Sequence, residues 1–349
     1  MLENNRSHRT APSRRRVLKG GVALGGVAAM SSLVSVEVLG ADAAKVNMQL
    51  GWLASNGIMG EVVAKRTGIY EELGIELEVT PGGPGVDGVA SVAAGRAQVG
   101  HLSSSPSLML ARSAGIPVKA FAAGYQKHPF TYFSLANNPV RTPQDMIGKT
   151  IATQPTAVIL LRALLAKNGI AEDQVEIVKM GSDMNQVMTG QAAAVTGWMT
   201  NTNALKILGD DRVDMMLWDA GIQLYANVYY ATDEMLAEHA DVLTRFLTGS
   251  ARGWGEARKN PEAGVDHLVA EYQNLDRGSE LEAVGPVLGF SFNDVTAAEG
   301  WAAMNPANWQ AQLDTYAELE QFQGPTPSVD DVMTSDILAA TEAVRKQVG

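Results

Sequence analysis

Aromatic and hydrogen-bonding side chains at the ends of predicted strands are the residues of this chain best suited to chemistry. Trp52 ends the apolar strand pattern of residues 45–52, and Asn56 lies in the loop that follows. Ligands of open α/β sheets bind at the carboxyl ends of strands. There an indole can stack on a flat heterocycle, and an amide can donate to a ring nitrogen or carbonyl. We expect both side chains to contact a ligand, the alternatives being a core tryptophan and a turn asparagine.

Three consecutive serines follow the predicted strand 97–102 and begin the predicted helix 105–113. They are Ser103, Ser104 and Ser105. One serine is explained by capping of the free amides at a helix start, and the same amides can bind an anion. Because capping needs one hydroxyl, we expect the remaining hydroxyls to face a ligand.

The second half of the chain repeats this arrangement. Gln154 and Thr156 lie between the predicted strand 149–153 and a helix, and Trp198 and Asn201 lie at the end of the strand pattern 193–199. Side chains alternate along a strand, so Trp198 shares a face with polar neighbours two positions away. We expect these four residues to contact a ligand, although Trp198 would also suit a core.

Several reaction classes lack the residues they need. The chain has no cysteine, which excludes disulfides, thiol nucleophiles and cysteine-ligated metals. Its five histidines show no metal-ligand spacing. No catalytic triad or acid–base pair stands out. We therefore expect a binding protein with no catalytic residues, no metal and no cofactor.

A glycine pattern, Gly83-x-Gly85-x-x-Gly88, formally matches a dinucleotide-binding fingerprint. That fingerprint also needs an acidic residue about 20 positions later to bind the ribose. No acid occurs between Asp87 and Asp145. We interpret the segment as a tight turn at the edge of a cleft.

Strand and helix patterns alternate with short loops from residue 45 to 135, and this α/β pattern restarts near residue 149. Beyond residue 233 almost every pattern is helical, including 235–259, 261–272 and 307–320. Such alternation favours parallel sheets covered by helices. The sequence therefore predicts two α/β lobes and a helical C-terminal region.

Residues 1–43 have the layout of an export signal. The twin arginine Arg14-Arg15 precedes an apolar run over 20–34, and Ala41-Asp42-Ala43 fits a cleavage site. The run of about 15 residues is shorter than the roughly 20 needed to cross a bilayer. We expect export to the periplasm by the Tat route and, without a cysteine for lipid attachment, no lipid anchor.

The chain is acidic, with a formal net charge of −11 over 349 residues. Residues 1–43 hold more basic than acidic side chains, so the remainder is more negative still. Such a surface repels phosphate backbones, and we expect no nucleic-acid partner.

Several segments carry a family resemblance. They are residues 51–79 (GWLASNGIMGEVVAKRTGIYEELGIELEV), 81–88, 126–130 (QKHPF), 190–201 (GQAAAVTGWMTN) and 300–309 (GWAAMNPANW). In this order, from Val46 to about Leu338, the chain resembles the SsuA/THI5-like (NMT1) solute-binding proteins of ABC importers.

The resemblance implies an α/β fold of the type II periplasmic binding protein class, whose two lobes close over a ligand by a hinge motion. It places crossover strands near 130–135 and 228–232. Lobe I would comprise 44–134 and 227–349, and lobe II 135–226. Gln126 lies before the first crossover, and Tyr225 and Tyr229 lie at the second, where we expect ligand contacts.

The resemblance also implies a function. The protein would capture a small planar nitrogen heterocycle, such as a precursor of the thiamine pyrimidine, and deliver it as a monomer to an ABC permease at the inner membrane. The alternative ligands are an aliphatic sulfonate, taurine or nitrate, held by helix N-termini and an arginine. Gly51 stands where pyrimidine-binding members often carry Asn or Asp, so both classes of ligand remain candidates.

Two other functional classes share the fold. A pyrimidine-forming fungal enzyme of the family uses its own histidine and a cysteine-rich motif. This chain has Ile58 at the histidine position and no cysteine. A sensory module that signals to a membrane kinase is also compatible with the fold. The residues favour the importer component over the enzyme, whereas a pull-down of the membrane partner distinguishes it from the sensory module.

Overall fold

A computed structural model describes residues 43–83 and 86–349. The predicted export signal therefore lies outside the described residues except for Ala43, as do Pro84 and Gly85 of the glycine-rich turn. Within the described ranges, no helix has both the length and the apolar character needed to cross a membrane.

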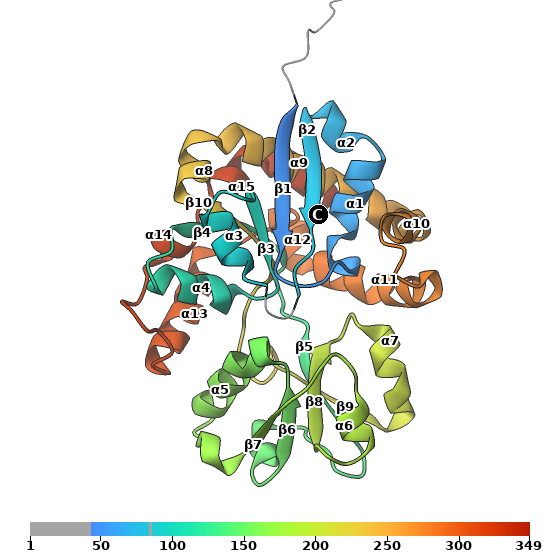
Figure 1. The fold of residues 1–349 in the computed structure, drawn as a ribbon, viewed down its shortest axis with the longest axis vertical. Helices are drawn as coiled ribbons and strands as arrows, with labels where there is room; N and C mark the ends of the chain where they lie inside the picture. Colours follow the sequence, from blue (N-terminus) through green and yellow to red (C-terminus); the bar gives the residue numbers. More distant parts are fainter. Residues whose placement is uncertain (1–42, 84–85) are drawn as a thin grey trace, which may run out of the picture. The chain divides into compact units, whose positions relative to one another are not determined.

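The first lobe is built on a five-stranded sheet in the order β2-β1-β3-β10-β4 (Figure 1). Its strands are β1 (Ala44–Leu50), β2 (Ile75–Thr80), β3 (Val99–Leu102), β4 (Val118–Tyr125) and β10 (Ala226–Thr232). Alternation directs Ile75 and Leu77 of β2 into the core and leaves the residues between them exposed. β1 is parallel to β2 and β3, whereas β10 is antiparallel to β3 and β4. The expected all-parallel sheet is therefore wrong at β10, because the chain returns from the second lobe at the carboxyl end of the sheet.

The second lobe has its own five-stranded sheet, in the order β7-β6-β8-β5-β9. Its strands are β5 (Phe130–Leu135), β6 (Thr150–Thr153), β7 (Glu176–Lys179), β8 (Ala194–Trp198) and β9 (Arg212–Met216). β5 pairs antiparallel with β8 and β9 along its whole length. A lobe boundary after residue 134 therefore does not fit this sheet, and the chain crosses over at 126–129 and returns at 217–225.

Helices cover both sheets (Figure 1). In the first lobe they are α1 (Met59–Arg66), α2 (Ile69–Glu72), α3 (Gly88–Ala93) and α4 (Ser105–Ser113), preceded by the 3₁₀ turn η1 (Asn56–Ile58). In the second lobe they are η3 (Pro155–Ala157), α5 (Val158–Lys167), α6 (Asn185–Met188), α7 (Thr202–Leu205) and η5 (Lys206–Asp211).

The C-terminal region is helical, as predicted, and packs mainly on the first lobe. It comprises α8 (Asp233–Glu238), α9 (Ala240–Lys259), α10 (Pro261–Glu271), α11 (Arg277–Ser291), α12 (Asp294–Glu299), α13 (Pro306–Glu318), α14 (Val329–Val332), α15 (Asp336–Ala340) and α16 (Glu342–Val348). The helix expected over 235–259 is interrupted at His239, whose φ of −131° is not helical. α9 lies close against α1, where a Cβ on Gly253 would be 2.0 Å from the carbonyl oxygen of Gly60.

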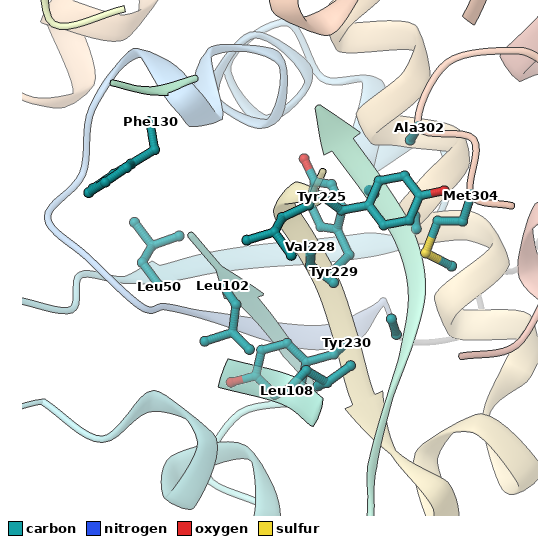
Figure 2. Close-up of a cluster of buried hydrophobic side chains, with 14 of the residues drawn as sticks. Leu50, Leu102, Leu108, Phe130, Tyr225, Val228, Tyr229, Tyr230, Ala302 and Met304 are labelled. Atoms are coloured by element: carbon teal, nitrogen blue, oxygen red, sulfur yellow. The ribbon is translucent and has the colours of Figure 1, made fainter. Parts of the chain in front are cut away.

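The core of the first lobe contains one buried carboxyl group. Figure 2 shows part of this core, with Leu50 of β1, Leu102 of β3 and Tyr229 of β10 among its buried side chains. Glu61 of α1 is the buried carboxyl group. The Tyr229 hydroxyl donates to Glu61 at 2.7 Å, and the Trp254 indole donates at 3.2 Å. Burial raises the pKa of Glu61, and these hydrogen bonds partly oppose the shift.

The two sheets meet at their carboxyl edges. Ala226 at the start of β10 pairs with Tyr125 at the end of β4, and Phe130 at the start of β5 pairs with Trp198 at the end of β8. Because the linker 126–129 is short, these two edges lie close together. The loops that follow the parallel strands of both lobes therefore converge in one region. Open α/β sheets bind their ligands at such loops.

Candidate functional site

An aromatic cluster joins the two carboxyl edges. The ring centroids of Trp198 and Tyr125 are 6.2 Å apart, with an angle of 51° between the rings. His128 of the linker contacts the same indole edge-on at 5.3 Å, and Phe290 of α11 lies 5.8 Å from Tyr125. We call Tyr125, His128, Trp198 and Phe290 the aromatic cluster. Tyr125 and His128 are buried, whereas Trp198 and Phe290 are partly exposed at this edge.

Unbonded polar atoms accompany this cluster. Within the described part of the chain, the buried atoms near the carboxyl edges that have no hydrogen-bond partner include Ser104 Oγ, Tyr125 OH, His128 Nε2 and Ser291 Oγ. Burial raises the pKa of Tyr125 well above its usual value, and the nearby side chains of Ser291 and Asn227 oppose part of that shift. A buried polar group without a partner costs about 1–3 kcal/mol. A ligand that supplies hydrogen bonds here would relieve that cost.

His128 is a neutral hydrogen-bond donor in this environment. Its Nδ1 accepts from the backbone N–H of Phe130 at 3.1 Å, so the ring proton resides on Nε2. Burial lowers the pKa of His128 to about 3, and the backbone of Ser103 opposes this only in part. The imidazole therefore offers an N–H at neutral pH without carrying charge.

Asn227 is a further candidate residue that the sequence analysis did not include. Its φ is 51°, a left-handed conformation that few non-glycine residues adopt, although asparagine does so more readily than most. Its Nδ2 donates to the Gly57 carbonyl at 3.2 Å, which ties the start of β10 to η1. Strained backbone of this kind concentrates at ligand sites. The signal available in the sequence was an asparagine two residues before the pair Tyr229-Tyr230 in a predicted strand.

The structure places the predicted residues of the first lobe around this edge. Trp52 is partly buried after β1, and its carbonyl accepts from Gly82 N–H at 2.9 Å. Asn56 begins η1 and donates from Nδ2 to Glu280 Oε2 at 3.0 Å. Ser103 and Ser104 follow β3 and are partly buried. These four residues stay in our candidate site.

The predicted residues of the second lobe lie at the facing edge. Trp198 is partly buried at the end of β8 and belongs to the aromatic cluster. Gln154 follows β6 and donates to the Gly181 carbonyl at 3.3 Å. Thr156 and Asn201 are exposed at the starts of helical turns. We keep all four as candidates.

Two predicted residues serve the packing of α13 on the first lobe. Ser105 Oγ donates to Gln312 and accepts from the backbone N–H of Tyr225. The Tyr225 hydroxyl accepts from the N–H of Asn305 at 2.8 Å. Since these polar atoms are already bonded, we remove Ser105 and Tyr225 from the candidate site.

Gln126 and Tyr229 are also removed. Gln126 is buried, and its Nε2 donates to the Ala123 carbonyl at 2.8 Å while its Oε1 accepts from Asn293. Tyr229 is buried in the core, where it donates to Glu61. Its neighbour Tyr230 is buried as well, and the pairing of β10 with β4 shifts register between the two tyrosines.

Within residues 43–83 and 86–349, no group of three or more His, Asp or Glu side chains is arranged to hold a metal ion. A surface hollow occurs at the opposite edge of the first sheet, with Lys119, Asp233 and Ile337 among its lining residues. That edge carries the amino ends of the parallel strands, so it lies away from the converging loops.

The sequence profile of the family described as "NMT1/THI5 like" matches residues 55–264, which is more than half of the chain. The chain belongs to the NMT1/THI5-like family. The resemblance found in the sequence motifs is thereby confirmed. The matched segment contains every member of the aromatic cluster except Phe290.

This NMT1/THI5-like chain is similar to two characterised binding proteins. It is 26% identical over 216 residues to the riboflavin-binding protein RibY of Chloroflexus aurantiacus, covering 59% of this chain and 61% of RibY. It is 25% identical over 231 residues to a formylaminopyrimidine-binding protein of Halalkalibacterium halodurans, covering 64% and 69%. The matched part thus spans less than two thirds of RibY.

A solved structure supports the fold of this NMT1/THI5-like protein. The alkanesulfonate-binding protein SsuA of Xanthomonas axonopodis pv. citri, bound to MOPS, matches with a TM-score of 0.62 and 16% identity. The match covers 84% of this chain and all of SsuA. The fold is therefore that of a periplasmic binding protein, as the sequence predicted.

Proposed function

We propose that this protein is the solute-binding component of an ABC importer, that it is not an enzyme, and that it binds a small planar nitrogen heterocycle between its lobes. The aromatic cluster carries this proposal, because Trp198 of one lobe meets Tyr125 of the other across the carboxyl edges. A flat ring held there would contact both lobes at once. Binding would thereby favour the closed arrangement of the lobes.

The polar atoms beside the cluster suit such a ring. The Nε2–H of His128 can donate to a ring nitrogen or carbonyl, and the hydroxyls of Tyr125 and Ser104 can donate or accept. Stacking on an aromatic side chain contributes about 0.5–1.5 kcal/mol beyond the area buried. Riboflavin and formylaminopyrimidine, which the two relatives bind by their names, both contain flat nitrogen heterocycles.

A second candidate is an aliphatic sulfonate, taurine or nitrate. It is favoured by Ser104, which begins α4 with extended backbone and a hydroxyl that makes no capping hydrogen bond. A helix start of this kind attracts anions. The basic residue of the linker, Lys127, is paired with Asp219 at 3.0 Å, which weakens the case for an anion.

A thermal-shift panel distinguishes the candidates. The probes are 4-amino-5-hydroxymethyl-2-methylpyrimidine and riboflavin on one side, and ethanesulfonate and nitrate on the other. A ligand at 100 times its Kd adds about 2.7 kcal/mol of stability. The proposal expects a shift with a heterocycle, whereas a shift confined to the anions would establish the second candidate instead.

We further propose that residues 1–43 direct Tat export and that the mature protein works as a monomer in the periplasm, where it meets its permease. The twin arginine Arg14-Arg15 supports this. Lysine substitution of both arginines should leave the protein in the cytoplasmic fraction of a host with a Tat system. Unchanged periplasmic yield of that variant would contradict the assignment.

A further inference from the structure

The carboxylate of Glu280, on α11, lies at the rim of the candidate site without a cation. Its Oε2 accepts from Asn56 Nδ2 at 3.0 Å. Among the residues that the structure describes, no Lys, Arg or His nitrogen lies within 4.0 Å of it, and Oε1 makes no hydrogen bond. By contrast, Glu282 on the same helix is paired with Lys206 at 2.6 Å.

The surroundings of Glu280 connect it to the proposed site. α11 packs against η1, which follows Trp52 and the end of β1, and against α7 of the second lobe. The far end of the same helix carries Phe290 of the aromatic cluster. At about 1.5 Å per residue, roughly 15 Å of helix separates Glu280 from Phe290. Glu280 therefore lies at the end of α11 that adjoins η1 and the loop carrying Trp52, whereas Phe290 lies at the end that adjoins Tyr125.

Glu280 is partly buried, so water solvates its charge incompletely. Burial raises its pKa, and the nearby carboxylate of Asp276 raises it further, while the hydrogen bond from Asn56 lowers it. No described basic side chain offsets the charge. A ligand N–H or ammonium group at Oε1 would do so, and charge-assisted hydrogen bonds of this kind are about twice as strong as neutral ones.

We propose that Glu280 recognises an amino or ammonium group of the ligand through Oε1, with Asn56 holding Oε2 in place. The inference rests on the proposed function, since it places the ligand in the same site. It adds that the preferred ligand carries an amine on the side that faces Asn56 and the start of α11. An otherwise identical ligand with a hydroxyl in place of the amine should bind more weakly.

Calorimetry with two matched pairs of probes tests this. The first pair is 4-amino-5-aminomethyl-2-methylpyrimidine and its 5-hydroxymethyl counterpart, and the second is taurine and 2-hydroxyethanesulfonate. The wild type should prefer the amine of whichever pair binds by about tenfold or more. Glu280→Gln should reduce that preference to less than about threefold. Glu318→Gln, which removes an exposed and unpaired charge on α13, should keep it.

The outcomes separate the two proposals. Pyrimidine binding with no amine preference would leave the proposed function standing and overturn the role of Glu280. Binding of taurine alone, with a preference that Glu280→Gln abolishes, would support Glu280 and overturn the heterocycle. If neither pair binds, or if Glu280→Gln retains the preference, the inference is overturned. Circular dichroism and the Tm of Glu280→Gln establish that the variant is folded.

Discussion

Tyr125 and Trp198 end strands of different sheets, yet their ring centroids lie 6.2 Å apart. The contact arises because β4 leads through the short linker 126–129 directly into β5, which pairs with β8. His128 of that linker touches the same indole. The crossover and the aromatic surface proposed to bind the ligand are therefore one structural unit, so occupation of the site and closure of the lobes should be coupled.

Trp198→Ala should weaken binding of the heterocycle by about 1–3 kcal/mol, because stacking and buried apolar area are both lost. Trp52→Ala should fall in the same range if its indole covers the other side of the ring. Calorimetric titration measures both. Phe322→Ala, which truncates a partly buried ring packed on Tyr316, is the control and should bind normally. Equal affinity in all three variants would contradict the stacking claim.

Tyr125→Phe should separate binding from stability. Its hydroxyl has no hydrogen-bond partner in the described chain, so removing it should leave the free energy of unfolding unchanged or raise it by about 1 kcal/mol. Affinity should fall by about tenfold if the hydroxyl bonds the ligand. Tyr70→Phe is the matched control, since its hydroxyl lies 2.8 Å from Ser250 Oγ. That variant should lose about 1 kcal/mol of stability and keep its affinity. The reverse pattern would remove Tyr125 from the site.

The buried histidines predict how stability depends on pH. The folded-state pKa of His128 is lowered to about 3 and that of His101 to about 4, both chiefly by burial. An unfolded histidine takes up a proton below about pH 6.5, whereas these two stay neutral in the folded state. The stability that they contribute is therefore full above about pH 6.5. As the pH falls towards the folded-state pKa values, each histidine removes about 1.4 kcal/mol of stability per pH unit.

Urea unfolding of the wild type and His128→Asn between pH 7 and pH 4.5 measures this contribution. The variant should lose less stability across the range, because one of the two titrating groups is absent. His101 remains and should preserve part of the slope. Identical slopes in the two proteins would show that His128 does not stay neutral in the folded state.

The ion pair of Lys206 and Glu282 joins the second lobe to α11 at 2.6 Å. Both side chains are about half exposed, so the pair should contribute little to the free energy of unfolding. The pair should instead shift the equilibrium between the open and closed arrangements of the lobes. Glu282→Lys should raise the radius of gyration of the ligand-free protein in low-salt X-ray scattering, and salt should diminish the effect.

The charge swap Lys206→Glu with Glu282→Lys is the control for that experiment. It restores opposite charges at the same two positions, so the radius should return towards that of the wild type. If the swapped protein scatters like the single variant, the pair does not hold the lobes together.

Strand-end reasoning predicted from the sequence which residues lie at the carboxyl ends of strands. Trp52, Ser104 and Trp198 each follow an apolar or alternating run, and local periodicity is enough to place such residues at a carboxyl edge. The order of elements and the helical C-terminal region followed from the same patterns. The sheet to which β5 belongs did not, because strand periodicity carries no information about the partner strands.

The remaining contributors come from residues distant in the chain. Phe290 of α11 contacts Tyr125, and Glu280 of the same helix bonds Asn56. Each pair is more than 150 residues apart in the chain, so only tertiary packing brings its members together. Asn227 depends on a left-handed backbone at the start of β10. The facing of Tyr229 into the core is set by strand pairing, which the single sequence does not specify.

Native mass spectrometry of the protein purified from the periplasm tests the central claim most directly. The account predicts that the wild type retains an unmodified aromatic nitrogen compound and that Trp198→Ala, folded to the same extent, loses it. Retention of the same compound in equal amount by Trp198→Ala, or capture of anions alone, would contradict it.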